Sequence, residues 1–355
     1  MYDEHSEVAA LQRALGTEWP HINAARALAR QTRSELHSAL NRKDSEDTSI
    51  VVFGSLARDE YTAGSDIDWT LLVDGFADPK HLDLTREIRE IVSLHSAREP
   101  GREEVFGSMA FSHDLVHQIG GDDDTNKNTT RRILLLLESS AVGRPEAYDR
   151  VVRNVLERYL LEDRSFLRAT ASFRVPRFLL NDFARYWRTM AVDFAYKART
   201  RARKGAAIRN MKLRMSRKLI YVSGLLNCFT CHLDLSAGER SDLFNSIDAD
   251  RRFVDYFRQR LTRTPLEVLA GAFLRREDLT AGAERVFLAY DKFLGALSDG
   301  ATREHLEQLT PEKEESDEIY SQLRATSREF RDGILALFFD DRTELADLTK
   351  VYGLF

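Results

Sequence analysis

Two apolar runs joined by a polar spacer constrain the fold of this chain more than any other feature. Residues 51–73 read VVFGSLARDEYTAGSDIDWTLLV, and both ends of this stretch are typical of buried strands. The first run ends at Gly54-Ser55, and the second begins around the pair Asp66 and Asp68. Strands joined by so short a connection are usually neighbours in one sheet. The sequence therefore places two carboxylates at the start of a core strand.

The carboxylate pair has the chemistry of a metal site. Residues two apart on a strand face the same side of the sheet, so Asp66 and Asp68 are expected to point the same way. Two such carboxylates repel each other, which favours a bound cation. Mg²⁺ prefers oxygen ligands, commonly one or two carboxylates together with substrate phosphates and water. The alternative is two acids that flank a strand on a solvated face.

Gly54 and Ser55 have the chemistry of a phosphate-binding turn. Glycine lets the backbone approach a phosphate closely, and turn amides with a serine hydroxyl can cradle the phosphate. Transfer of a phosphoryl or nucleotidyl group needs mainly positioning and metal ions that neutralise phosphate charge. The order of strand, Gly-Ser, Asp-x-Asp and strand therefore favours the metal site over the solvated face.

The spacer between the two motifs has a structural interpretation. Arg58 and Glu60 are predicted to form a salt bridge that braces the loop. Thr62 and Ser65 are predicted to serve as turn or capping hydroxyls.

Strand signals are confined to one part of the chain. Residues 5–42 carry apolar residues at helical spacing, and residues 106–119 alternate as one or two further strands would. Beyond these residues the pattern is almost wholly helical. We therefore expect an α+β fold. A small mixed β-sheet core, residues 46–125, is flanked by an N-terminal helical segment, residues 1–45, and a large all-helical C-terminal region, residues 126–355.

Charge and hydropathy exclude several classes of protein. The 355 residues are 43% hydrophobic with a net charge of −5, which excludes wholesale disorder and a general polyanion binder. No apolar run reaches the roughly 18 residues of a membrane span. The acidic start MYDEHSEVAALQRAL lacks the pattern of a signal peptide. A reducing, cytoplasmic location is the default expectation for a chain with two cysteines.

The two cysteines, Cys228 and Cys231, form a CxxC motif. Zinc requires about four ligands, and His232 is the one obvious neighbour. A redox pair is a second interpretation. The apolar context LLNCFTCHL favours a third, two small core residues on a buried helix.

The string GSLARDEYTAGSDIDW, set between two apolar strands, resembles the signature of the DNA polymerase β nucleotidyltransferase superfamily. It is most similar to the branch of bacterial regulatory uridylyltransferases, glutamine synthetase adenylyltransferases and their nucleotidyltransferase relatives. The resemblance is strongest over residues 50–75 and weaker over residues 134–143 and 174–197. It implies a nucleotidyltransferase core at residues 46–125 and a following helical domain that completes the cleft for nucleotide and acceptor.

The resemblance also implies roles for individual residues. Gly54 and Ser55 would hold the triphosphate of an NTP such as ATP. Asp66 and Asp68 would be catalytic and would bind two Mg²⁺ ions, with Mn²⁺ as an alternative. In the superfamily a third acid on a later strand usually completes the metal site and activates the acceptor hydroxyl.

Asp114, in FSHDLVHQI, is the preferred candidate for the third catalytic and metal-binding acid, because it lies in the strand region of the right order. The acidic cluster of Asp122, Asp123 and Asp124 is the alternative, and its plainer interpretation is a solvated loop. His113 and His117 flank Asp114, but on a strand they would face the opposite side, so they do not form a metal triad with it.

Residues 195–218 form a predicted basic helix that contains ten Lys or Arg residues and no acid. The basic residues are Lys197, Arg199, Arg201, Arg203, Lys204, Arg209, Lys212, Arg214, Arg217 and Lys218. Lys212 or Arg209 is expected to reach the phosphates of the nucleotide, with Ser216 on the same face, and the resemblance adds weight to Lys212. The other charges fit either an RNA acceptor or a solvated face.

A second polar stripe lies upstream on an expected helix. Arg177, Asn181, Arg185 and Arg188 recur at steps of three and four residues and so share a face that could line the cleft. The aromatic residues Tyr186 and Trp187 beside this stripe are expected to pack in the core.

The leading functional hypothesis is a nucleotidyltransferase. It would move an NMP group from an NTP to an acceptor hydroxyl, on a protein side chain, an RNA end or a small molecule, and release pyrophosphate. The resemblance slightly favours a protein acceptor, and the basic helix slightly favours RNA. A cyclic or oligonucleotide synthase of the same superfamily, and a non-catalytic nucleotide-binding sensor, are the alternatives. A helical interaction protein with an accidental motif is disfavoured by the length and order of the motif.

Overall fold

The computed structural model describes residues 6–96, 106–162, 175–200, 205–340 and 342–353. Contacts divide the chain into two compact units, each built from separate chain segments. We call the first the sheet unit, which comprises Ala25–Ala171 and Ser241–Thr264. The second, the helical unit, comprises Met1–Ala24, Ser172–Arg240 and Pro265–Phe355.

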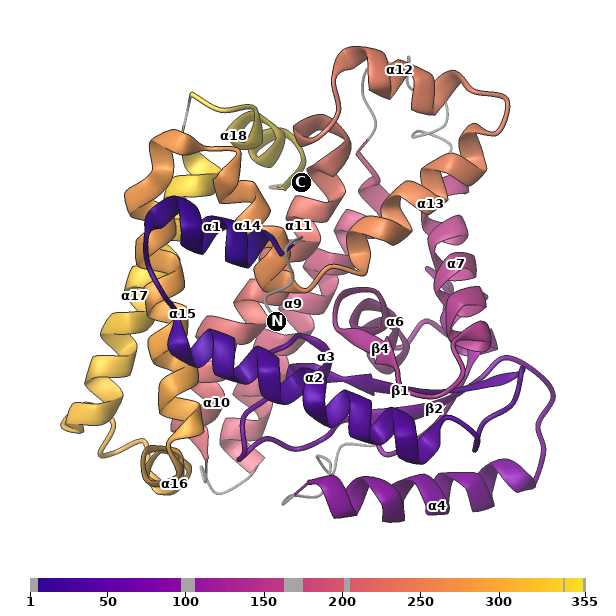
Figure 1. The fold of residues 1–355 in the computed structure, drawn as a ribbon, viewed down its shortest axis with the longest axis horizontal. Helices are drawn as coiled ribbons and strands as arrows, with labels where there is room; N and C mark the ends of the chain where they lie inside the picture. Colours follow the sequence, from indigo (N-terminus) through magenta and orange to yellow (C-terminus); the bar gives the residue numbers. More distant parts are fainter. Residues whose placement is uncertain (1–5, 97–105, 163–174, 201–204, 341, 354–355) are drawn as a thin grey trace. The chain divides into compact units, whose positions relative to one another are not determined.

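The sheet unit contains a four-stranded mixed sheet in the order β3-β2-β1-β4 (Figure 1). The strands are β1 (Thr48–Phe53), β2 (Trp69–Val73), β3 (Ser108–Phe111) and β4 (Ser139–Ala141). β1 pairs antiparallel with both β2 and β4, whereas β2 pairs parallel with β3. This small mixed sheet among many helices confirms the predicted α+β class.

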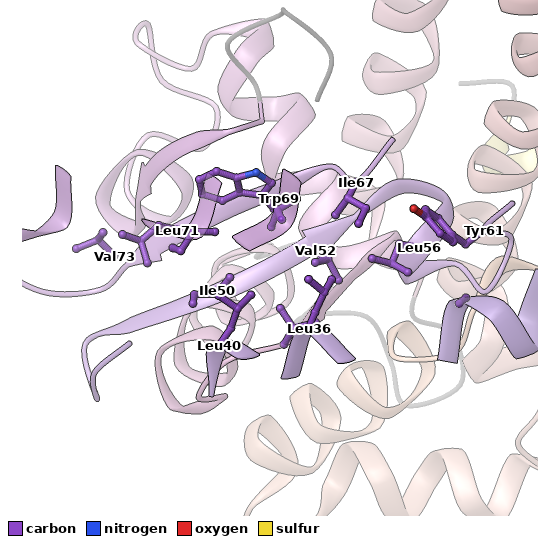
Figure 2. Packing of buried hydrophobic residues seen from close by; sticks show 14 residues of the cluster. Leu36, Leu40, Ile50, Val52, Leu56, Tyr61, Ile67, Trp69, Leu71 and Val73 are labelled. Atoms are coloured by element: carbon purple, nitrogen blue, oxygen red, sulfur yellow. The ribbon is translucent and has the colours of Figure 1, made fainter. Parts of the chain in front are cut away.

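Helices flank the sheet on both faces. The helices of this unit are α2 (Pro20–Leu40, of which residues 25–40 belong to this unit), α3 (Gly54–Ala57), α4 (Lys80–His95), α5 (Ser112–Val116), α6 (Asn126–Leu137), α7 (Glu146–Leu161) and α13 (Ala249–Leu261), which packs on α7. Leu36 and Leu40 of α2 pack against Ile50 and Val52 of β1 in one buried cluster (Figure 2). Helix α4 adds to this cluster, and α7 packs against β1 and β2.

The two faces of the sheet differ in chemistry. The face toward α2 and α4 is apolar, with Ile67, Trp69, Leu71 and Val73 all in its core (Figure 2). Since side chains alternate along a strand, the intervening residues face the other side. The carboxylate pair therefore belongs to the face opposite this core.

The helical unit has no strand among its described residues. Its elements are α1 (Glu7–Leu15), α9 (Arg177–Thr200), α10 (Ala206–Lys212), η1 (Leu213–Arg217), α11 (Lys218–Leu233), α14 (Pro265–Leu274), η2 (Glu277–Leu279), α15 (Thr280–Ser298), α16 (Gly300–Gln308), α17 (Glu318–Phe339), α18 (Glu344–Leu348) and η3 (Thr349–Gly353). Helix α12 (Ala237–Asn245) carries the chain from this unit into the sheet unit. Helix α11 is buried along nearly its whole length, which suits the central element of a helical core.

Specific polar contacts fix the start of the chain onto the helical unit. Glu267 of α14 accepts hydrogen bonds from the Ser6 hydroxyl at 2.6 Å and from the Val8 amide at 3.1 Å. Asp291 of α15 accepts from the Ile22 amide at 2.9 Å. These carboxylates satisfy amides near the starts of α1 and α2 that have no partner within their own helices.

Two local expectations need correction. Residues 106–119 contain one strand, as expected, but β3 ends at Phe111 and the helix α5 follows. Residues 139–141 form β4, although the sequence beyond the expected sheet core has an almost wholly helical pattern. The Ser-Ser-Ala run of β4 has no apolar alternation, and it is a strand because it pairs with β1. The compact units also cross the expected domain limits at residues 45 and 125.

The structure places Cys228 and Cys231 as free, fully buried thiols on α11, which confirms the interpretation as core residues. Burial raises the pKa of the Cys228 thiol well above its usual value. No helix among the described residues combines the length and the apolar character needed to cross a membrane.

Candidate functional site

The Gly-Ser turn and the carboxylate pair meet at the end of β1. In the β1–β2 ladder Val52 pairs with Trp69, and the Phe53 amide donates to the Asp68 carbonyl at 2.9 Å, so the pairing continues past β2. Gly54 follows with a φ of 67° and starts α3. The chain therefore turns away from the sheet directly beside Asp68.

Gly54 is required here by conformation and by space. Its φ of 67° lies in the left-handed region that side chains rarely adopt. A Cβ atom at this position would also lie 2.9 Å from Oδ2 of Asp68. The missing side chain thus lets the backbone turn and the carboxylate occupy one small volume.

Asp66 and Asp68 share a face, as the i, i+2 spacing predicts. Ile67 and Trp69 are fully buried in the apolar core, whereas both carboxylates are half-buried on the other side. Their Cβ atoms are separated by roughly 7 Å at the rise of an extended chain. Burial raises the pKa of Tyr61, and the nearby charge of Asp66 raises it further.

A buried charge network braces the turn, and the predicted Arg58–Glu60 salt bridge is confirmed. Arg58 donates from Nε and Nη2 to Oε2 of Glu60 at 3.0 and 2.9 Å. It also donates from Nη1 to Glu138, a residue that sequence reasoning missed. All three side chains are buried, and the Glu60 amide donates to the Ser55 carbonyl at 2.9 Å. The network therefore ties the spacer to the phosphate turn and to the residue that precedes β4.

Four further contacts hold the spacer. Asp59 has a φ of 62°, and its carboxylate accepts from Nη2 of Arg33 on α2 at 2.5 Å. Arg33 also donates to the Leu56 carbonyl. The hydroxyls of Thr62 and Ser65 lie 3.0 Å apart, and Oγ of Ser65 accepts from the Thr62 amide at 3.3 Å. Both serve the turn, as predicted.

Asp114 does not lie on a strand. It belongs to α5, which begins after Phe111, and Phe111 pairs with Val73 at the end of β2. Asp66 and Asp68 precede Trp69, at the opposite end of β2. The five-residue strand that separates the two ends is roughly 13 Å long. This distance weighs against Asp114 as a third ligand beside the pair, and its role stays a prediction. His113 and His117 are exposed, with ring centroids 5.1 Å apart, because one helical turn separates them.

The alternative acids are placed differently from one another. Asp122 and Asp123 are exposed, in keeping with a solvated loop. Asp124 is buried and accepts from Nη1 and Nη2 of Arg132 at 3.1 and 2.9 Å. Burial opposes the charge of Arg132, but its contacts with Tyr159 and Asp124 outweigh this effect and raise its pKa. Asp124 is therefore committed to a structural ion pair.

On the face of the sheet that carries Asp68, the neighbouring strand presents Ser108. The parallel register pairs Ser108 with Thr70, which is two residues beyond Asp68 and so faces the same side. Nη2 of Arg131 on α6 donates to Oγ of Ser108 at 3.2 Å. A hydroxyl and a guanidinium thus stand here, and sequence reasoning missed both because the β2–β3 register has no local signal.

The predicted basic helix is divided. Residues 201–204 lie outside the described residues, as do the side chains of residues 197–200. The chain then forms α10, a π-helical turn at η1 and the start of α11. Burial, followed by the charges of Arg214 and Arg331, lowers the pKa of Lys218. A continuous solvated basic face is therefore not present in the described part of the segment.

The candidate nucleotide contacts of this segment belong to the helical unit. Arg209 and Lys212 are half-buried, while Ser216 is buried within the π-helical turn. Nε of Arg214 donates to Asn210 at 2.8 Å, and Nη1 of Arg217 lies 3.2 Å from the Met190 sulfur. Their roles toward a nucleotide stay predictions.

The polar stripe upstream of the basic segment lies on the helix α9. Arg177, Asn181 and Arg188 are exposed on α9, and Arg185 is half-buried. Tyr186 is buried, and Trp187 stacks on Tyr221 with ring centroids 5.4 Å apart. The aromatic residues therefore pack within the helical unit, as predicted.

The donor set at the turn suits a hard cation. Asp66 and Asp68 offer carboxylate oxygens on one face beside a glycine, which fits a Mg²⁺ site completed by substrate phosphates and water. Within the described ranges no three acids, histidines or cysteines gather as a metal cluster.

The sequence comparison agrees with this geometry. Residues 33–101 match the family model of the nucleotidyltransferase domain. The matched segment holds Gly54, Ser55, Asp66 and Asp68, so it spans the whole turn and carboxylate pair. No curated protein and no solved structure matches the chain. The nucleotidyltransferase match supports the superfamily, and the branch, the metal and the acceptor are matters of proposal.

Proposed function

We propose that this protein transfers an NMP group from an NTP to a hydroxyl on a protein side chain, with Mg²⁺ as cofactor. The observation that carries the proposal is the contact geometry at Gly54, where a left-handed turn lies against the Asp68 carboxylate. Phosphate-binding backbone and metal-binding oxygens are thereby adjacent. The match of residues 33–101 to the nucleotidyltransferase domain supports the same reaction class.

Each group of residues has a separate role in this proposal. The backbone at Gly54 and Ser55 holds the triphosphate, since no side chain blocks its approach at Gly54. Asp66 and Asp68 hold Mg²⁺, which when bound neutralises phosphate charge and orients the reacting groups. Arg131, positioned by Ser108, adds a cation on the same face of the sheet. Arg58 keeps the turn in place.

The reaction balances without a further reactant. The acceptor hydroxyl oxygen forms a bond to the α-phosphorus, the bond from that phosphorus to the bridging oxygen breaks, and pyrophosphate leaves. The hydroxyl proton passes to solvent. A protein acceptor is preferred to RNA because Arg214 and Arg217 make contacts inside the helical unit, which weakens the case for a free basic face.

The test is an incubation of the full chain with each of the four NTPs, labelled at the α-phosphate, in the presence of Mg²⁺ and cell lysate. We expect protease-sensitive label with at least one NTP, and none when the double variant Asp66→Asn/Asp68→Asn replaces wild type. γ-Labelled NTP should leave the acceptor unlabelled, which separates nucleotidyl from phosphoryl transfer. Nuclease-sensitive label would replace the protein acceptor with RNA.

Absence of transfer with every NTP would refute the enzymatic proposal, and saturable NTP binding without turnover would indicate a sensor. The same assay includes Lys212→Ala, which is expected to raise the KM for the NTP in a chain that stays folded. An unchanged KM would remove Lys212 from the site.

Gly54→Ala is expected to lower activity on the order of 100-fold, because its Cβ displaces the Asp68 carboxylate. Gly16→Ala is the matched control. Gly16 has a similar φ of 63°, but a Cβ there meets no atom within 4 Å. Both variants carry a backbone strain of roughly 1–2 kcal/mol. Measurement of transfer kinetics and thermal unfolding for both variants should separate the effect of backbone strain from that of the displaced carboxylate. Equal activities of Gly54→Ala and Gly16→Ala would contradict the role of Gly54 in the site.

A further inference from the structure

An aromatic pair lies beside the Asp68 carboxylate. The Phe53 amide donates to the Asp68 carbonyl at 2.9 Å, and the β1–β2 register places these two residues directly opposite each other. Opposed side chains of antiparallel strands share a face, with Cβ atoms about 5 Å apart. Phe53 is buried, and its ring packs on the ring of Phe106, with centroids 5.1 Å apart and planes tilted by 42°. Both rings therefore stand on the face of the sheet that carries Asp68.

Phe106 reaches this face from the far side of β2. It lies two residues before β3, and the amide of the next residue, Gly107, donates to the Trp69 carbonyl at 2.7 Å. The strand order β3-β2-β1 puts β2 between the segments that carry the two rings. The contact between Phe53 and Phe106 therefore spans β2 beside Asp68. Phe106 is only half-buried, so part of its side chain stays accessible.

The proposed reaction gives the two sides of Asp68 different roles. In such transfers the attacking and leaving oxygens lie roughly in line, on opposite sides of the phosphorus. Pyrophosphate leaves toward Gly54 and Ser55 at the end of β1, because these residues hold the triphosphate in the proposed site. The acceptor hydroxyl then approaches from the side of β3, where Phe106 lies.

Water is the competing nucleophile at the acceptor position. Its oxygen would form a bond to the α-phosphorus while the bond to the bridging oxygen breaks, pyrophosphate leaves and a proton passes to solvent. The NTP would then be hydrolysed to NMP, and no acceptor would be modified. Exclusion of water from the reacting atoms prevents such side reactions, and an apolar ring is suited to that task.

We propose that Phe106 forms the wall of the acceptor side and keeps water from the α-phosphate until an acceptor hydroxyl enters. Phe53 packs on the ring of Phe106 and so fixes its place. Phe106 is a positioning residue, since its side chain binds no metal and carries no proton. It decides between transfer and hydrolysis within the proposed nucleotidyl transfer, on which this role depends.

The test measures two products of α-labelled NTP made by the full chain with Mg²⁺. Free NMP is measured with the purified protein alone, and protein-bound label is measured after addition of cell lysate. The inactive Asp66→Asn/Asp68→Asn variant gives the background of each assay. Phe106→Ala should raise the ratio of NMP release to transfer by roughly tenfold or more, because a water molecule fits the space left by the ring.

Phe111→Ala is the matched control. Phe111 lies at the other end of the same strand and is also half-buried, but it packs against the apolar cluster on the face toward α2 and α4. Its loss should leave the ratio unchanged, even where both rates fall with stability. Phe106→Leu keeps a smaller apolar side chain and should raise the ratio less than Phe106→Ala. It decides the matter if thermal unfolding shows that Phe106→Ala does not fold.

Three results would overturn the role of Phe106 and leave the proposed function intact. The first is a wild-type chain that transfers label but releases NMP equally fast. The second is a wild-type ratio in a folded Phe106→Ala, and the third is a wild-type ratio in Phe106→Leu where Phe106→Ala does not fold. A wild-type chain that yields neither product would refute the proposed function, and the role of Phe106 with it.

Discussion

Asp68→Asn is expected to lower kcat/KM for nucleotidyl transfer by about 10³-fold without unfolding the protein. The substitution removes a charged ligand from the pair that holds Mg²⁺ and retains the shape of the side chain. Charge stabilisation by a bound metal amounts to several kcal/mol, and about 4 kcal/mol corresponds to a factor of 10³. Asp66→Asn should act in the same direction, because the i, i+2 spacing puts its carboxylate on the face that carries Asp68.

The measurement is steady-state transfer of α-labelled NTP at several Mg²⁺ concentrations, with thermal unfolding as the test of folding. Asp83→Asn is the control, because Asp83 lies on α4 in the same unit and forms an exposed pair with Arg86. Removal of a charge from the repelling pair should leave the metal-free protein at least as stable as wild type. An Asp68→Asn variant that keeps a tenth of wild-type activity would contradict the metal assignment.

Arg58→Met is expected to destabilise the sheet unit by about 3–5 kcal/mol, the usual cost of breaking a buried ion pair by removing one partner. Glu60 and Glu138 are buried, and each would lose its guanidinium partner. The loss also releases the spacer that fixes Gly54 and Ser55, so activity should fall with stability. Urea unfolding, read by hydrogen–deuterium exchange of peptides that cover β1 and β2, measures the change in this unit.

A rescue variant separates charge from packing. Arg58→Met/Glu60→Gln/Glu138→Gln removes the unpaired charges and should recover most of the lost stability, because neutral replacement of a buried ionic network is often tolerated. Arg86→Met breaks an exposed pair on α4 and should leave exchange unchanged. Equal destabilisation by the single and triple variants would show that Arg58 acts through packing of its stem rather than its charge.

Local spacing was sufficient to predict much of the candidate site. Gly54, Ser55, Asp66 and Asp68 lie at the junctions of two strands whose apolar runs are unmistakable, and i, i+2 alternation alone puts both carboxylates on one face. The Arg58–Glu60 pair is two residues apart and was equally readable. The long helix α2 was predicted because its apolar spacing repeats over several turns.

The remaining features depend on which distant segments pair. β4 is a strand only because Ser139–Ala141 lies beside β1, and that pairing brings Glu138 to Arg58. Asp114 was misplaced because a short apolar run does not reveal where β3 ends and α5 begins. The π-helical turn at η1 likewise breaks a basic run that reads as one helix.

The sequence by itself determined the two core strands, the turn between them and the acid pair, since each depends on residues a few positions apart. Only the tertiary structure decided that Ser108 faces the same side of the sheet as Asp68 and holds Arg131 there, and that Glu138 completes the Arg58 network. Strand register and helix packing are set by contacts between residues far apart in the chain, and these leave no periodic trace in the sequence.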